Sequence, residues 1–255
     1  MHMKKKKAEI ISQKEIAPDI YDMVLSFPEG AREAKPGQFI AMYCNDGTKL
    51  LPRPISICGI DGEKGTLRVV YRIAGEGTKQ FSLLKAGDTL EVMGPLGNGF
   101  TMKEEKAIII GGGIGIPPML ELARQLKAEK TVVLGYKDQL FLKEEFDEVA
   151  EVKVATEDGS VGTKGTVLDA IKEAEVTGAV LYACGPMPML RALAEYAKEH
   201  QMEAQISLEE RMACGVGACL GCICKTKEKD HHTNVNNSRI CKDGPVFDAR
   251  EVVFP

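Results

Sequence analysis

Cys214-Gly215-Val216-Gly217-Ala218-Cys219-Leu220-Gly221-Cys222 is the most informative stretch of this 255-residue sequence, and a further cysteine follows at Cys241. The intervals C-x4-C-x2-C, with a more distant fourth cysteine, match the plant-type spacing that holds a [2Fe–2S] cluster. Glycine and alanine between the thiols let the backbone fold tightly around a compact group and aim N–H donors at its sulfurs. The spacing therefore predicts Cys214, Cys219, Cys222 and Cys241 as ligands.

Two other uses of these cysteines compete with that interpretation. A zinc ribbon usually pairs two C-x2-C knuckles, and this module has one. Structural disulfides are disfavoured because the sequence shows no secretory signal. Cys224 would lie on the same side of a strand as Cys222 but about 6.6 Å further along, so we expect it to be spare. The spacing favours an iron–sulfur cluster, which moves one electron at a time.

Composition limits the functional classes further. Charged residues make up 27% and hydrophobic residues 44% of the chain, as in ordinary soluble domains. The net charge of −4 gives no basic footprint for nucleic acid, and the longest apolar run, residues 107–116, is too short to span a membrane. Eight cysteines without a recognisable targeting segment predict a cytoplasmic protein. The run Lys4-Lys5-Lys6-Lys7 is expected to form a solvated, frayed N-terminus.

Turn signals and hydrophobic periodicity predict three domains: residues 1–102, 103–208 and 209–255. In the first, short β-rich segments separated by Pro-Gly and Asp-Gly turns predict a small antiparallel barrel. In the second, strands alternate with helices, which predicts a doubly wound parallel sheet. The expected barrel strands are 20–27, 38–43, 54–60, 66–73 and 88–93, with a brief helix near 78–84. The expected sheet strands are 107–110, 131–136, 151–156, 179–184 and 203–208, and the expected helices are 117–129, 140–149, 166–174 and 187–200.

A glycine-rich turn, Gly111-Gly112-Gly113-Ile114-Gly115, joins the first parallel strand to its helix. Such a turn lets the backbone approach a pyrophosphate at a helix N-terminus, although a tight turn without ligand fits the same residues. No arginine stands at the usual ribose position, which favours NAD over NADP, while Lys137 leaves that choice open. Cys184-Gly185-Pro186 ends a strand at the same edge. Cys184 fits two roles equally, a neighbour of the nicotinamide or a small buried residue.

The barrel segment carries two further candidate phosphate sites. Arg53-Pro54-Ile55-Ser56 offers a guanidinium fork and a hydroxyl on a rigid β segment, which suits a diphosphate. Val70-Tyr71-Arg72 leads into Gly77-Thr78, where a strand ends and a short helix opens, with Tyr71 able to present an aromatic face. Each motif alone is weak. However, nicotinamide transfers two electrons and the cluster takes one, so a chain that holds both needs a converter such as flavin.

Together these motifs resemble the ferredoxin-reductase superfamily across residues 8–208. With the ending Cys241-Lys242-Asp243-Gly244-Pro245-Val246-Phe247, the whole chain resembles the electron-transfer subunits of class 1B dihydroorotate dehydrogenases. That resemblance implies FAD in the barrel, NAD at the parallel sheet and [2Fe–2S] in the C-terminal module. It also implies a separate FMN-bearing catalytic subunit that oxidises dihydroorotate to orotate in pyrimidine synthesis, within a heterotetramer of two chains of each type.

The same resemblance assigns roles to individual residues. Arg53 and Ser56 would bind the FAD diphosphate and ribityl region, with Gly77 and Thr78 at the phosphates. The remaining barrel residues, Ile55 and Val70 to Arg72, would line the isoalloxazine and adenine ends. Electrons would pass from FMN through the cluster and FAD to NAD⁺, and no residue of this chain is expected to be the base that acts on dihydroorotate.

Two other functions fit parts of the sequence. One is a relative that draws electrons from NAD(P)H for another partner, such as a ferredoxin-linked transhydrogenase, a hydrogenase or a sulfite reductase. The other is a zinc-stabilised nucleotide-binding module without redox chemistry, which would be colourless. His231-His232 is expected in a hairpin loop rather than as a Rieske-type ligand pair, because four cysteines already suffice.

Overall fold

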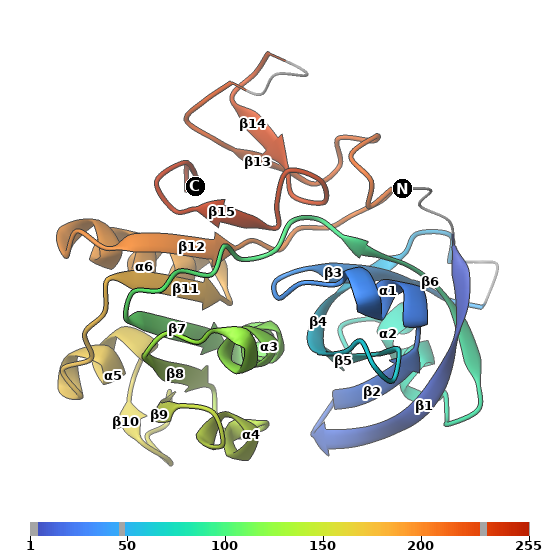
Figure 1. Ribbon diagram of the computed structural model, residues 1–255, viewed down its shortest axis with the longest axis horizontal. Coiled ribbons are helices and arrows are strands. Elements are labelled where there is room, and N and C mark those ends of the chain that lie inside the picture. The colour runs from blue at the N-terminus through green and yellow to red at the C-terminus, as the bar shows by residue number, and fades with distance from the viewer. Residues whose placement is uncertain (1–4, 46–48, 230–233, 255) are drawn as a thin grey trace.

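A computed structural model describes residues 5–45, 49–229 and 234–254 of the chain. Figure 1 shows a β-barrel, a parallel sheet flanked by helices, and a C-terminal module that lies over both. The predicted fold class is therefore confirmed. Within the described ranges, no helix is long and apolar enough to cross a bilayer. The residues His231 and His232 lie outside these ranges.

Six antiparallel strands form the barrel, in the order β1-β2-β5-β4-β3-β6. Pairing of β1 with β6, which sets Lys6 opposite Val92, closes the ring. Inward-facing side chains such as Met23, Ile57 and Val69 are fully buried and form the barrel core. The strands are β1 Lys6–Ala17, β2 Ile20–Ser26, β3 Phe39–Tyr43, β4 Arg53–Asp61, β5 Thr66–Arg72 and β6 Thr89–Leu96. Two short helices, α1 Pro28–Glu33 and α2 Glu76–Ser82, lie in the connections.

The first barrel strand corrects the sequence-based expectation of a frayed lysine run for Lys6 and Lys7, while Lys4 lies outside the described residues. Lys6 and Lys7 are the first residues of β1, and they pair with β6 through Val92 and Glu91. The strand escaped prediction because most of its side chains are exposed and polar, with only Ala8 and Ile10 fully buried. Lys5 adds a cation–π contact, with Nζ 3.8 Å from the centroid of the Tyr43 ring.

The second part is a seven-stranded sheet in the order β10-β9-β8-β7-β11-β12-β15, in which β15 is Val246–Asp248. The chain moves outward from β7 to β8 and β9, then returns to the other side of β7 with β11, so the switch point lies between β7 and β11. The strands are β7 Ala107–Gly112, β8 Lys130–Tyr136, β9 Glu151–Thr156, β10 Thr163–Lys164, β11 Val180–Cys184 and β12 Glu203–Ser207. The helices are η1 Gly113–Gly115, α3 Ile116–Gln125, α4 Lys143–Asp147, α5 Val167–Glu173 and α6 Met187–Glu199.

The C-terminal module contributes a strand to this sheet, which the sequence did not indicate. β15 Val246–Asp248 pairs antiparallel with β12, setting Ile206 opposite Phe247 and Ser207 opposite Val246. The rest of the module contains a small hairpin of β13 Ile223–Lys225 and β14 Asn237–Arg239. The cysteine module is therefore part of the sheet edge rather than a separate appendage.

A network of charges joins the barrel to the sheet domain. Arg68 on β5 donates from Nε to Asp22 at 2.8 Å and from Nη1 to Glu145 at 2.6 Å. Glu145 on α4 also accepts from Arg124 on α3 at 2.7 Å. A carboxylate oxygen of Glu121 on α3 accepts from the backbone N–H of Ile60 at 3.1 Å. These bonds hold α3 and α4 against the outer surface of β4 and β5.

We expect Glu145→Gln to lower the free energy of unfolding by about 1–3 kcal/mol, because it leaves part of the half-buried Arg68 charge unpaired. Hydrogen bonds from Arg68 hold the pKa of Glu145 below its ordinary value of 4.5. A depressed pKa stabilises the fold above pH 4.5 and loses that contribution as the carboxylate protonates. Urea titrations should therefore show a gap between variant and parent at pH 7 that narrows below pH 4.5.

Glu195→Gln is the matched control, because Glu195 makes an exposed ion pair with Arg191 on the outside of α6. Its urea midpoint should stay at the parental value across the pH range. An unchanged stability for Glu145→Gln at pH 7 would contradict the assigned role of the network.

Candidate cofactor sites

A cavity of about 660 Å³ opens where the barrel, the sheet and the C-terminal module meet. Its barrel wall contains the residues singled out from the sequence: Arg53, Pro54, Ile55, Ser56, Val70, Tyr71, Arg72 and Thr78. From the sheet domain, Ile114 of the glycine-rich turn reaches the same cavity. The barrel motifs and the glycine-rich turn, which are far apart in the sequence, thus border a single space.

Arg53 and Gly77 meet at one end of this barrel wall. A Cβ atom placed on Gly77 would collide with Nε of Arg53, so only glycine permits the guanidinium to lie there. Nη1 of Arg53 donates to the carbonyl of Leu51 at 2.6 Å, which leaves other N–H groups of the fork directed elsewhere. This convergence of a guanidinium with the start of α2 fits the diphosphate of a dinucleotide.

Thr78 and Tyr71 line the cavity and also make hydrogen bonds that stabilise the barrel and the turn before α2. The Thr78 hydroxyl accepts from the N–H of Ala74 at 2.8 Å and donates to the carbonyl of Gly75 at 3.0 Å, which shapes the turn before α2. The Tyr71 ring is 1% exposed and packs in the barrel core, and its hydroxyl donates to Gln13 at 2.9 Å. The aromatic face expected of Tyr71 is thus largely turned into the barrel.

A third wall of the cavity was not predicted from the sequence. It runs from the end of β12 towards the cysteine loop and comprises Ser207, Leu208, Glu209, Glu210, Arg211 and Met212, with Pro245 beside them. The N–H of Leu208 donates to the carbonyl of Pro245 at 2.9 Å, which joins the two segments. The surrounding protein desolvates Glu209 and raises its pKa. One sequence signal could have indicated this wall. Its residues follow the carboxyl end of β12, and ligands of doubly wound sheets bind beyond the carboxyl ends of the strands.

The two strand–helix turns at the switch point pack directly against each other. A Cβ on Gly115 would collide with the carbonyl oxygen of Cys184, and one on Gly112 would lie 2.5 Å from the sulfur of Met189. Close packing therefore requires these glycines whether or not a ligand is present. Gly113 is different, because it has φ +53° and a Cβ placed on it would meet no atom within 4 Å. It is the glycine of this turn that faces open space.

Cys184 is fully buried beneath these turns, and burial raises the pKa of its thiol. Its position fits the simpler of its two predicted roles, a small residue that closes the strand–helix turn. Gly185 packs equally tightly, since a Cβ there would lie 2.5 Å from the terminal methyl of Met189. Pro186 follows as the residue that precedes α6.

The cysteine loop directs backbone N–H groups at its sulfurs, as its glycines and alanines predicted. Sγ of Cys214 accepts from the N–H groups of Val216, Ala218 and Cys219 at 3.3–3.4 Å. Burial alone would raise the pKa of Cys214, but these donors lower it to about 6. Sγ of Cys241 accepts from the N–H of Gly217 at 3.1 Å, and Sγ of Cys222 from the N–H of Cys241 at 3.4 Å. Donors placed in this way stabilise thiolates bound to iron.

Backbone donors also link the four proposed ligands, since the N–H of Cys219 donates to Sγ of Cys214 and the N–H of Cys241 donates to Sγ of Cys222. Among the described residues, no three His, Cys, Asp or Glu side chains converge on one point as they would around a single ion. Cys224 stands apart, because its Sγ donates to the carbonyl of Ser238 at 3.6 Å and burial raises its pKa to about 11.

Comparison with protein families matches two parts of the chain. Residues 7–100 match the oxidoreductase FAD-binding domain, and residues 209–253 match the iron–sulfur cluster binding domain of dihydroorotate dehydrogenase B. A curated protein of Caldanaerobacter subterraneus, named as a dihydroorotate dehydrogenase B (NAD(+)) electron transfer subunit, is 45% identical over 98% of this chain and 99% of its own length. A Bacillus cereus protein of the same name is 43% identical over 99% of this chain and 100% of its own.

Solved structures give the same picture of the fold. An NADH-dependent reduced ferredoxin–NADP oxidoreductase superposes with a TM-score of 0.87 at 28% identity, covering 97% of this chain and 90% of the other. A ferredoxin–NADP⁺ reductase from Neisseria gonorrhoeae, solved with bound FAD and NADP, superposes with a TM-score of 0.65 over 82% of this chain and 94% of the other. At 17% identity the second likeness concerns the fold alone.

Gly77→Ala and Arg53→Ala should both weaken FAD binding, the first by displacing the guanidinium and the second by removing it. Each lost charge-assisted hydrogen bond is worth roughly 1.5–3 kcal/mol, so affinity should fall by about 10- to 150-fold for each bond lost. Flavin content after purification and fluorescence titration of the apoprotein measure this. Gly62→Ala is the control, because its Cβ would meet nothing closer than 3.8 Å. Full flavin occupancy in both variants would place the diphosphate elsewhere.

Cys241→Ser should abolish the EPR signal of the reduced cluster, whereas Cys224→Ser should retain it. The two residues differ in that Sγ of Cys241 accepts a hydrogen bond from Gly217 of the cysteine loop, whereas Sγ of Cys224 donates to the carbonyl of Ser238. Iron and sulfide content measured on the same preparations separates cluster loss from a change of spin state. Loss of the signal in Cys224→Ser with retention in Cys241→Ser would reverse the assignment.

Proposed function

The chain belongs to the family of dihydroorotate dehydrogenase B (NAD(+)) electron transfer subunits, and we propose that it connects the flavin of a catalytic partner to NAD⁺ through its own iron–sulfur cluster and FAD. The proposed ligands of a [2Fe–2S] cluster are Cys214, Cys219, Cys222 and Cys241. In this scheme the electrons leave FMN on the partner subunit and reach NAD⁺ by way of the cluster and FAD. The cluster carries single electrons, and FAD converts them into the pairs that NAD⁺ accepts.

The observation that carries this proposal is that the segments on either side of the cysteine loop both border the cavity that Arg53 lines, which we propose as the flavin cavity. Arg211 and Met212 line the cavity, and the first proposed ligand, Cys214, is two residues after Met212. In the segment that leaves the module, Pro245 lines the cavity four residues after Cys241. A bond between Leu208 and Pro245 ties the two segments together. A flavin held by Arg53 would therefore lie next to the cluster within the same chain.

The proposed place for NAD(H) is the switch point between β7 and β11. Ligands of doubly wound sheets bind at this point, beyond the carboxyl ends of the strands. Gly113 leaves the turn open there, and the neighbouring Ile114 reaches the flavin cavity. A nicotinamide bound at this edge would meet the flavin from the sheet side. The cluster module borders the flavin on another side, so electrons would enter and leave through different walls.

The proposed docking surface for the partner is the outer face of the cysteine loop. Leu220 and Ile223 are 44% and 45% exposed, and they flank the buried Cys222. Cys219 is also exposed, so one sulfur of the proposed cluster lies near the protein surface. Apolar side chains exposed beside a redox centre suit a protein interface. We propose a heterotetramer with two copies of each chain, located in the cytoplasm.

Reconstitution tests the function directly. Purified alone, the chain should be brown-yellow and reduce dyes with NADH, yet give no orotate from dihydroorotate, because that reaction needs a general base facing a flavin. Adding the FMN-bearing catalytic subunit should produce orotate and NADH together. Leu220→Glu tests the docking surface separately, because it should leave dye reduction by NADH intact and weaken assembly with the partner.

Two outcomes would contradict the proposal. Orotate formation by this chain alone would show that the substrate site lies here. An inactive pair, together with rapid reduction of a ferredoxin by NADH, would favour the ferredoxin-linked alternative, which the likeness to the NADH-dependent reduced ferredoxin–NADP oxidoreductase also suggests.

A further inference from the structure

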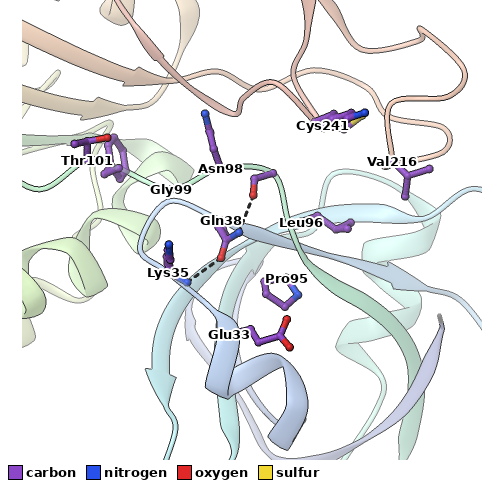
Figure 2. Close-up of a pocket in the computed structure, with 14 residues that line it drawn as sticks. Glu33, Lys35, Gln38, Pro95, Leu96, Asn98, Gly99, Thr101, Val216 and Cys241 are labelled. Carbon is purple, nitrogen blue, oxygen red and sulfur yellow. Dashed lines mark hydrogen bonds between the residues drawn. The ribbon is translucent and has the colours of Figure 1, made fainter. Parts of the chain in front are cut away.

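The linker between β6 and β7 borders all three parts of the molecule. Residues 97–101 of the linker line a cavity of about 780 Å³, together with Glu33, Lys35 and Gln38 of the barrel. The opposite wall comes from the cysteine module, through Val216, Cys241 and Lys242. Figure 2 shows Asn98 extending from the linker towards the C-terminal module, away from Gln38. The linker thus lies between the barrel and the loop that carries a proposed ligand.

On its barrel side the linker is fixed by bonds that do not involve Asn98. The side-chain amide of Gln38 donates to the carbonyl of Gly97 at 2.7 Å, and its oxygen accepts from the N–H of Lys35 at 2.8 Å. The N–H of Phe100 donates to the carbonyl of Pro36 at 2.9 Å. The backbone around Asn98 is therefore anchored to the barrel on both sides.

On its other side, Asn98 uses its whole amide to hold the turn after Cys241. Its Nδ2 donates to the carbonyls of Asp243 at 3.1 Å and Val246 at 2.9 Å, and its Oδ1 accepts from the N–H of Val246 at 3.0 Å. The backbone N–H of Asn98 donates to the carbonyl of Gly244 at 2.7 Å. All of these partners lie between Cys241 and the first residues of β15.

The turn held by Asn98 is itself rigid. Asp243 accepts from Nε of Arg239 at 2.9 Å and from Nη2 at 3.0 Å, which closes the turn on either side of Cys241. Gly97 also packs against it, since a Cβ there would lie 2.6 Å from the carbonyl oxygen of Gly244. A rigid turn moves as a unit, so its position relative to the barrel depends on the bonds at its outer edge.

We propose that Asn98 is a positioning residue for electron transfer between the flavin and the cluster, because it fixes the Cys241 turn relative to the barrel that holds the flavin. This inference rests on the proposed function. The rate of electron tunnelling falls steeply with distance, so a small displacement of Cys241 and Pro245 from the flavin wall slows transfer. Asn98 is not among the described residues that line the cavity at Arg53, and its side chain bonds to Asp243 and Val246, so its effect passes through the turn.

The test separates the two half-reactions of the flavin. In Asn98→Ala, anaerobic stopped-flow mixing with NADH should bleach the flavin at the parental rate, while reduction of the cluster, followed by rapid-freeze EPR, should slow by about 10- to 100-fold. Asn98→Asp should behave like Asn98→Ala, because a carboxylate cannot donate to the two carbonyls. Asn45→Ala is the matched control, since Asn45 donates to Thr89 on the far part of the barrel.

Hydrogen exchange provides a readout that does not depend on electron transfer. Peptides covering residues 239–248 should exchange faster in Asn98→Ala, while those covering β5 should not. If Asn98→Ala loses its cluster during purification, Asn98→Ser, which keeps an acceptor for Val246, takes its place in both measurements. Parental cluster reduction with unchanged exchange, or equal slowing of both half-reactions, would overturn the proposal. A parent chain without a cluster would contradict the proposed function instead, and exchange would still test the role of Asn98.

Discussion

The arrangement of the cofactor sites depends on the antiparallel pairing of β12 with β15. This short ladder sets Ser207, the last residue of β12, opposite Val246, the first residue of β15. The chain therefore leaves the sheet for the cysteine module and re-enters it at the same end of the sheet. Because of that register, the segment that approaches Cys214 and the segment that departs from Cys241 run side by side past the cavity that Arg53 lines. A parallel strand at this edge would have carried one of the two segments to the opposite end of the sheet.

The parts of the fold that were predictable have strong local signals. Ala107-Ile108-Ile109-Ile110 is apolar on both faces because both faces of β7 are covered, and all four residues are fully buried. The cysteine spacing and the glycines between the thiols likewise express local geometry, namely N–H groups that converge on Cys214. In these places each residue's environment is set by its near neighbours in the sequence.

The parts that were not predictable depend on partners distant in the sequence. β1 is a polar strand whose ladder is completed by β6, and β15 is too short to have a recognisable period. The cavity wall at Glu209 and Met212 has no motif of its own, since its position follows from the β12–β15 register. Gly115 shows that a motif can be recognised for the wrong reason. Gly115 fits the pattern of a phosphate-binding turn, yet the contact that requires a glycine at this position is with the backbone of Cys184.

The shared sheet also bears on how such a chain can be divided or recombined. Removing everything after Leu208 would expose the N–H and C=O groups of β12 along a newly created sheet edge, together with the apolar side chain of Ile206. A reductase core without the cysteine module would therefore need a replacement strand or a covering loop to remain monomeric. A gene fusion or fragment exchange between relatives could join the chains in the linker between β6 and β7. The joined chain would then have to keep Asn98 together with the turn after Cys241 that Asn98 holds.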